Sequence, residues 1–234
     1  MKNNSFNIKI RKDVVGFLKK MNLFKSDNYV PEDHYTETVK EISRIGSHKQ
    51  IYDEICKTYS FDIMLSDDSI YQFHKDGDNY RYCFIQNPKV KYSWKEYLHN
   101  NDLKEDELTE EESNIYRSCY DNNEEDCFRL VENPMYIRYD VSGEEYCECS
   151  HPYSHLHIGL QNDLRIPVSM ILTPELFTEF SVKMTYRELW KEMYVKGDIS
   201  EFHKQVKRGC EPVNEKYWSK DDKLDLFTQV SDLE

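Results

Sequence analysis

The sequence predicts an α+β fold in which one antiparallel sheet of about six strands carries helices from both ends of the chain. Helical periodicity fills residues 1–60, and β-rich segments separated by turn signals follow over residues 61–175. The helical period returns in residues 176–234. Because strands and helices are grouped, an alternating parallel sheet is not expected. We therefore predict a single domain over residues 1–234.

The first part of the chain is predicted to be helical. Apolar residues recur at helical spacing over residues 10–23, and two further helices are expected over 35–45 and 49–59. Residues 1–25 carry seven Lys or Arg against Asp13, a net charge of +6. This end could contact phosphate, although lysine-rich helices are usually solvated faces.

The middle of the chain begins with a predicted three-stranded meander. Residues 61–65, 70–73 and 80–85 are β-rich, and the Asp-rich and Gly-containing segments between them are strong turn signals. A Ser-x-x-Glu capping box at Ser93 then starts a short helix.

An acidic excursion interrupts the predicted sheet. Residues 101–126 hold eleven acidic residues against two basic ones, a net charge of −9, with one helix expected near 107–119. Few apolar residues could anchor this segment, so we interpret it as an insertion or exposed flap.

The last predicted strands carry the polar side chains of greatest interest. Residues 135–141 alternate, and a turn at Ser142-Gly143 would pair Asp140 with Glu145, Arg138 with Cys147 and Tyr136 with Cys149. In an extended segment 154–160, His155 and His157 share one face and Leu156 lies on the other.

The end of the sheet and the C-terminal helices have their own signals. Pro167 predicts an edge strand over residues 164–168, because proline cannot donate to a ladder. Thr173 and Pro174 are a good helix start, and Thr185 with Glu188 predicts a second capping box.

Composition and charge bear on where the protein acts and on which ligands it could bind. Net charge is −13, aromatic residues make up 14 %, and no apolar run approaches the roughly 20 residues that span a bilayer. No secretory signal is expected, and seven irregularly spaced cysteines favour a reducing compartment, so we predict a cytoplasmic protein without membrane contact. Neither GxGxxG nor GxxxxGK[ST] occurs, which leaves the familiar nucleotide-binding loops unsupported.

The residue types around the histidines favour metal-independent cleavage of RNA. That reaction needs a base for the 2′-hydroxyl, an acid for the leaving oxygen and a cation near the phosphate. His155 and His157 could divide the acid and base roles, Asp140 could orient an imidazole, and Arg138 or Arg165 could hold the phosphate. Alternatively, the histidines only anchor strand ends by donating to backbone carbonyls. The predicted catalytic set is Asp140, His151, His155, His157 and Arg165, with Arg138 and Arg165 as phosphate ligands.

A metal site is a second interpretation of the same region. The ligand types suited to zinc are Cys147, Cys149, His151, His155 and His157, although Cys-x-Cys-x-His matches no known loop geometry. Asp and His without cysteine could instead bind Mn²⁺ or Mg²⁺. We therefore assign no metal ligand, and favour no cofactor.

The segment His-Pro-x-Ser-His-Leu-His-Ile-Gly, followed by Arg-Ile-Pro and Leu-Thr-Pro, resembles domain-of-unknown-function family 2290 of bacteria. The matching positions are Tyr139, Asp140, His151, Pro152, Ser154, His155, His157, Gly159, Arg165, Pro167 and Pro174. The pattern is similar, more loosely, to a small toxin family suspected of acting on RNA. Cys147, Cys149 and the acidic excursion depart from the family pattern.

The resemblance implies a function in anti-phage defence, because some members of the family lie beside a helicase gene in defence loci. The chain would then be a nucleic-acid-cleaving effector, or a non-catalytic adaptor that holds a helicase or ATPase inactive. Its expected partners are that helicase or ATPase and RNA or DNA.

Overall fold

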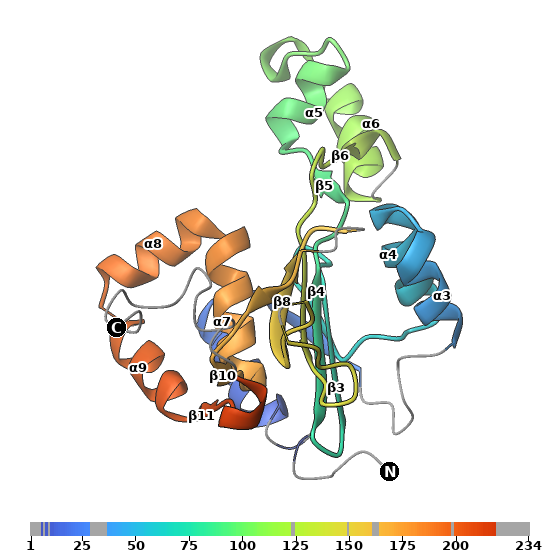
Figure 1. Cartoon of the computed structure of the whole chain (residues 1–234). Helices are drawn as coiled ribbons and strands as arrows, with labels where there is room; N and C mark the ends of the chain where they lie inside the picture. Colours follow the sequence, from blue (N-terminus) through green and yellow to red (C-terminus); the bar gives the residue numbers. More distant parts are fainter. Residues whose placement is uncertain are drawn as a thin grey trace. The chain divides into compact units, whose positions relative to one another are not determined.

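The computed structural model describes residues 6, 8, 10–28, 37–122, 125–148, 150–160, 164–197 and 199–218. The predicted α+β class is confirmed: helices accompany a seven-stranded antiparallel sheet with the order β1-β2-β3-β4-β7-β8-β9 (Figure 1). The chain divides into a main unit, Met1–Gln86 with Met135–Glu234, and an inserted unit, Asn87–Pro134. The prediction of a single domain stays a prediction.

The sheet belongs to the main unit. Its strands are β1 Phe24–Asp27, β2 Ile63–Leu65, β3 Ile70–Asp76, β4 Asn79–Ile85, β7 Tyr136–Val141, β8 Ser154–Ile158 and β9 Ile166–Pro167. The predicted meander is β2-β3-β4, and Pro167 lies on an edge strand as expected. A separate small ladder joins β10 Met170–Ile171 to β11 Glu211–Pro212.

The predicted hairpin at Ser142-Gly143 is wrong. β7 pairs with β8, so that Arg138 lies opposite His157 and Asp140 opposite His155. Among the residues that the structure describes, Cys147 pairs with His151, in an isolated bridge outside the strands. Glu and Pro are poor strand residues, and residues 144–152 contain three Glu and one Pro. The chain therefore leaves the sheet after Val141 and returns only at Ser154.

The helices of the main unit before Gly197 follow the predicted periodicity, whereas those beyond it lie in a polar segment for which no individual helix was predicted. They are the π-helical turn η1 Ile10–Val14, α2 Val15–Lys20, α3 Glu37–Ile45, α4 His48–Lys57, α7 Pro174–Thr185, α8 Arg187–Val195, α9 Ser200–Arg208 and the 3-10 turn η4 Glu215–Tyr217. Thr173 caps α7 as expected by accepting from the Leu176 N–H. The predicted capping box at Thr185 is wrong, because Thr185 is still the last residue of α7 and Tyr186 precedes α8 without a side-chain cap.

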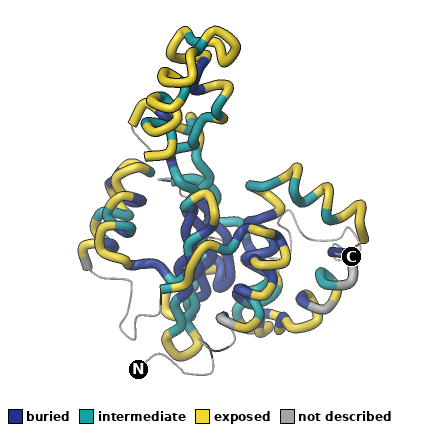
Figure 2. The backbone as a smooth tube through the Cα atoms, turned by 180° about the vertical axis from the view of Figure 1, so that it is seen from behind, coloured by how far each residue is buried: buried dark blue, intermediate teal, exposed yellow. Residues whose placement is uncertain are grey.

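Helices cover both faces of the sheet. Figure 1 shows α7, α8 and α9 on one side and α3 and α4 on the other. The first face is built from rings, as the aromatic content suggests, with Tyr71, Tyr82 and Phe177 fully buried in one core cluster. Buried residues are concentrated along the central strands (Figure 2).

The second face is apolar only over part of its length. Cys83 and Tyr136 pack there in a cluster with residues of α3 and α4. Because side chains alternate along a strand, Arg81 follows Cys83 on this face and Arg138 follows Tyr136. The polar stretch of the second face therefore starts where its apolar contact with α3 and α4 ends.

The inserted unit has a small core of its own, made by Tyr97, Leu98 and Cys127. Its elements are β5 Lys89–Lys91, α5 Trp94–Asn100, η2 Glu105–Glu107, α6 Glu110–Asp121, η3 Glu125–Cys127 and β6 Phe128–Leu130. The predicted capping box at Ser93 is confirmed, and α6 is the helix expected near 107–119. None of the helices among the described residues is long and apolar enough to cross a membrane.

Candidate functional site

Pairing of β7 with β8 gathers four polar side chains on one face of the sheet. Arg138 and Asp140 come from β7, and His157 and His155 lie opposite them on β8. The face shared by the two histidines is as predicted, but Asp140 reaches them through β7–β8 pairing and not through the hairpin. Asp140, His155 and His157 are only 4 %, 1 % and 5 % exposed. Such polar groups remain buried only when they are paired.

Two arginines hold the carboxylate of Asp140. Arg81 Nε donates to Oδ1 at 2.7 Å and Arg138 Nε donates to Oδ2 at 2.7 Å. Burial raises the pKa of Asp140, but the charges of Arg138 and Arg81 outweigh it, so the net pKa is lower than that of an ordinary aspartate. We call Arg81, Arg138, Asp140, His155 and His157 the histidine cluster.

Arg81 is the member that sequence reasoning missed. Its own strand shows the alternation that places it between Tyr80 and Tyr82, so its face on β4 could have been read. The pairing of β4 with β7, which sets Arg81 opposite Asp140, joins segments 59 residues apart. No local pattern reports such a pairing.

The two imidazoles face each other. His155 Nδ1 donates to the Pro152 carbonyl at 2.7 Å, and His155 Nε2 lies 3.0 Å from His157 Nε2. Arg138 Nη2 donates to that same His157 nitrogen at 3.0 Å. Burial lowers the pKa of His155 to about 4, and burial together with the Arg138 charge lowers the pKa of His157 to about 3. Both rings are therefore neutral at pH 7.

His151 and Arg165 lie at the edge of the cluster. The His151 ring is 5.0 Å from the His155 ring between centroids, and its Nε2 lies 3.5 Å from Glu145 Oε2. Burial and then the charge of Arg165 lower the pKa of His151. The same guanidinium charge also lowers the pKa of His155 and His157, so it acts on all three rings.

The structure thus brings Asp140, His155 and His157 together on one sheet face, with Arg138 beside them. The His151 ring, outside the strands, lies next to that of His155, and Arg165 is within electrostatic range. Their roles as catalytic groups stay a prediction. The alternative function of the histidines was to anchor the backbone by donating to carbonyl groups. One contact of this kind is present, from His155 Nδ1 to the Pro152 carbonyl.

Among the described residues, Asp140, His155 and His157 form a group whose ligand atoms lie within 4.8 Å of one another, as a metal ion requires. Cys147 is exposed, and its thiol contacts the Glu148 carbonyl. Cys149 lies outside the described residues, so the predicted cysteine-containing zinc set stays untested.

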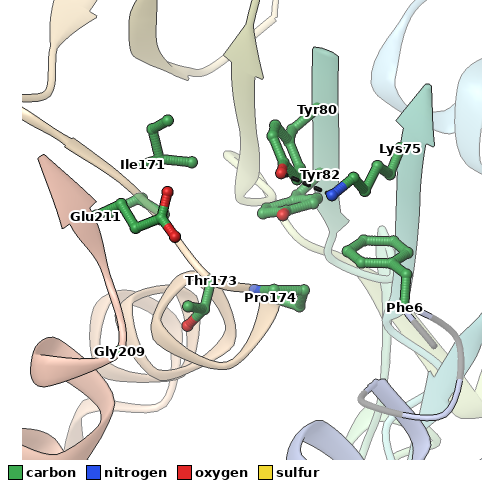
Figure 3. Close-up of a pocket in the computed structure, with 10 residues that line it drawn as sticks. Phe6, Lys75, Tyr80, Tyr82, Ile171, Thr173, Pro174, Gly209 and Glu211 are labelled. Carbon is green, nitrogen blue, oxygen red and sulfur yellow. Dashed lines mark hydrogen bonds between the residues drawn. The ribbon is translucent and has the colours of Figure 1, made fainter. Parts of the chain in front are cut away.

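Two cavities open on the opposite face of the sheet. The first, of about 310 Å³, is lined by Phe6, Tyr82 and Pro174 among others, with Lys75 donating to Tyr80 at its side (Figure 3). The second, of about 470 Å³, is mostly apolar and includes Glu179. Neither contains a residue of the predicted site.

Comparison with protein families shows that the chain matches a family of conserved proteins. The model of a family described as an uncharacterized conserved protein, DUF2290, matches residues 22–223, a span that contains the whole histidine cluster. No curated protein and no solved structure matches the chain.

Proposed function

The chain belongs to the DUF2290 family, and from the geometry of its histidine cluster we propose that it is a nucleic-acid-cleaving effector of a bacterial anti-phage defence system. The proposed reaction is ribonuclease-like cleavage of a phosphodiester in the cytoplasm. The observation that carries the proposal is the convergence of two imidazoles, a carboxylate and guanidinium groups within hydrogen-bonding distance on one sheet face.

Guanidinium groups supply the phosphate-binding side of the proposed site. The side chains of Arg81 and Arg138 are 33 % and 26 % exposed, whereas that of Asp140 is 6 % exposed. A phosphate approaching from solvent therefore meets positive charge before it reaches the carboxylate. Arg165 adds a third charge that acts on the same rings. Planar guanidinium forks suit phosphate oxygens and the charge that develops on them during cleavage.

The imidazoles supply the reactive side. Neutral rings offer lone pairs at pH 7 that can take a proton from a hydroxyl or hold a metal ion that activates it. His155 and His157 are neutral rings of this kind, and the carboxylate of Asp140 lies next to them. RNA brings its own nucleophile, the 2′-hydroxyl, next to each phosphorus. This favours RNA over DNA as the substrate.

The alternative is a non-catalytic adaptor of a helicase or ATPase in the same defence locus. The observation that favours it lies in the inserted unit, where all twelve residues of α6 are at least partly exposed and its first turn is Glu110-Glu111-Glu112. Such an acidic surface suits contact with a basic protein surface, including a nucleic-acid channel of the partner.

Purified protein incubated with end-labelled RNA and single-stranded DNA tests the proposal directly. We expect cleavage of RNA that the double substitution His155→Gln with His157→Gln abolishes. The matched control is His99→Ala, which removes an exposed histidine of α5 in the inserted unit.

A phage-protection assay combined with pull-down of the helicase partner separates the two functions. Loss of protection by the double variant with partner binding intact supports the effector. Two results together would refute the effector and support the adaptor. RNA stays intact with every preparation, and the double variant loses both protection and partner binding.

A further inference from the structure

We propose that Asp140 Oδ2, His155 Nε2 and His157 Nε2 bind a divalent metal ion of the zinc class. The binding of the ion stands on the geometry of the cluster alone. Its use in phosphodiester cleavage rests on the proposed function.

The first argument is the position of the protons on the two rings. His155 Nδ1 faces the Pro152 carbonyl at 2.7 Å, and a carbonyl oxygen can only accept, so this nitrogen carries the proton. His157 Nε2 faces Arg138 Nη2 at 3.0 Å, and a guanidinium can only donate, so this nitrogen carries a lone pair. In neutral rings, both Nε2 atoms are therefore acceptors.

These two acceptors nevertheless lie 3.0 Å apart. Asp140 Oδ2, a third acceptor, is 3.5 Å from His157 Nε2 and 4.0 Å from His155 Nε2. Among the described residues, the atom within hydrogen-bonding distance of His155 Nε2 is therefore another acceptor, and no proton bridges the two. Arg138 donates to two of these atoms, His157 Nε2 and Asp140 Oδ2, but the lone pair of His155 Nε2 still faces another acceptor. A cation between the three atoms would remove that repulsion.

The second argument is the size of the triangle. Ligands bound tetrahedrally to Zn²⁺ at about 2.0–2.1 Å lie about 3.3 Å from one another. The three separations in the cluster, 3.0, 3.5 and 4.0 Å, bracket that value. Two imidazoles and a carboxylate are a ligand set suited to zinc and its first-row neighbours, and three protein ligands leave a position for water or substrate.

The third argument is that the ligands already have outer contacts of the kind found around metal sites. The other ring nitrogen of His155, Nδ1, donates its proton to a backbone carbonyl, and Arg81 holds the second oxygen of Asp140 at 2.7 Å. Such contacts fix the ring tautomer and the carboxylate orientation. The adjacent strands β7 and β8 carry all three ligands, so the site is built on a rigid part of the sheet.

Arg138 competes with the ion. It donates to Asp140 Oδ2 and to His157 Nε2, which are two of the three proposed ligand atoms. Its side chain is 26 % exposed, so Nη2 can move toward solvent while Arg81 still holds Asp140. Removing the Arg138 charge should therefore tighten metal binding, a gain that a misfolded variant cannot mimic.

The test is titration of chelator-treated protein with Zn²⁺ by calorimetry, and with Co²⁺ followed by its visible absorption. We expect one equivalent to bind, with at least about tenfold weaker binding in His155→Gln and in His157→Gln. Arg138→Gln should bind at least about fivefold more tightly, because a like charge leaves the site. The controls His99→Ala and Cys147→Ser should bind as the unmodified protein does.

Less than a tenth of an equivalent of either metal, in the unmodified protein and in Arg138→Gln, would overturn the proposal. Binding that Cys147→Ser abolishes and the histidine variants leave intact would overturn it as well. The nuclease proposal fails separately: one bound equivalent without cleavage of RNA or DNA retains the metal site and removes the enzyme. Undiminished cleavage by chelator-treated protein that binds no metal retains the enzyme and removes the metal site.

Discussion

Asp140 is the residue on which the electrostatics of the histidine cluster depend, because its two oxygens each accept from a different arginine. Substitution Asp140→Ala leaves both guanidiniums without this partner. Breaking a fully buried pair costs about 3–5 kcal/mol, but Arg81 and Arg138 are partly solvated, so we expect a loss of about 2 kcal/mol. The measurement is the free energy of unfolding in urea.

The control for this prediction is Asp53→Ala, which removes an exposed carboxylate paired with Lys49 on α4. It should change the free energy of unfolding by less than about 0.5 kcal/mol. Equal effects of the two substitutions would contradict the central place of Asp140.

The two buried histidines predict how the stability of the metal-free protein depends on pH. Their pKa values in the folded protein, about 4 for His155 and about 3 for His157, are below the value of about 6.5 in an unfolded chain. Between these pH values the unfolded chain binds more protons than the folded protein does. The contribution of the two histidines to the free energy of unfolding is therefore fully present above pH 6.5 and is lost as the pH falls toward 4. Asp140, whose pKa is also lowered, acts in the same direction at still lower pH.

Urea denaturation at a series of pH values measures this dependence. We expect the free energy of unfolding to fall on the order of 3 kcal/mol between pH 6.5 and 4.5. The substitutions His155→Gln and His157→Gln should flatten that slope, and His99→Ala should not. An unchanged slope in the double variant would show that other groups cause the acid sensitivity.

At the scale of elements, Tyr139 links three strands. Its hydroxyl lies 2.8 Å from Ser154 Oγ on β8 and accepts from the Leu172 N–H, just after β10, at 2.9 Å. Tyr139→Phe leaves these buried groups short of a partner, so we expect a loss of about 1–2 kcal/mol in the free energy of unfolding. Tyr194→Phe, at an exposed position, is the matched control and should be neutral.

Individual elements were predictable wherever one local period decides the structure. The helix after Thr173, the three strands of the meander and the shared face of His155 and His157 all follow from spacing and capping. Pairing partners were not predictable, because they depend on contacts between distant segments. The hairpin at Ser142-Gly143 failed for this reason: a permissive turn residue does not make the flanking residues form a ladder.

In the candidate site, too, local patterns were predictable and contacts between distant segments were not. Asp140, His155 and His157 share one sheet face because a strand fixes the direction of its side chains, and the His151 ring lies next to that of His155. Arg81 was missed because it comes from another part of the chain. β1 was also missed, since Phe24–Asp27 has mostly exposed side chains and no alternation to reveal it.

At the scale of the whole molecule, the inserted unit leaves and rejoins the main unit at one point. The Gln86 N–H donates to the Met135 carbonyl at 2.9 Å, and the Met135 N–H donates to Gln86 Oε1 at 2.8 Å. We expect that replacing Asn87–Pro134 by a short Gly-Ser linker leaves the main unit folded, because closing a short loop between adjacent ends costs little. Circular dichroism and the Zn²⁺ titration measure the outcome.

The matched control places the same linker at Gly77, in the β3–β4 turn, without removing any residue. Both variants should bind the metal as the unmodified protein does. The variant with the linker at Gly77 should retain the circular dichroism spectrum, and the shortened chain should lose only the helical signal of α5 and α6. Unfolding of the shortened chain alone would show that the main unit depends on the inserted one.

The joined ends at Gln86 and Met135 also bear on how such a protein diversifies. A segment that departs and returns through one backbone ladder can be exchanged or resized without altering the neighbouring strands. Under the proposed function, a change in the inserted unit would then alter the contacts with a partner and leave the histidine cluster in the main unit as it is.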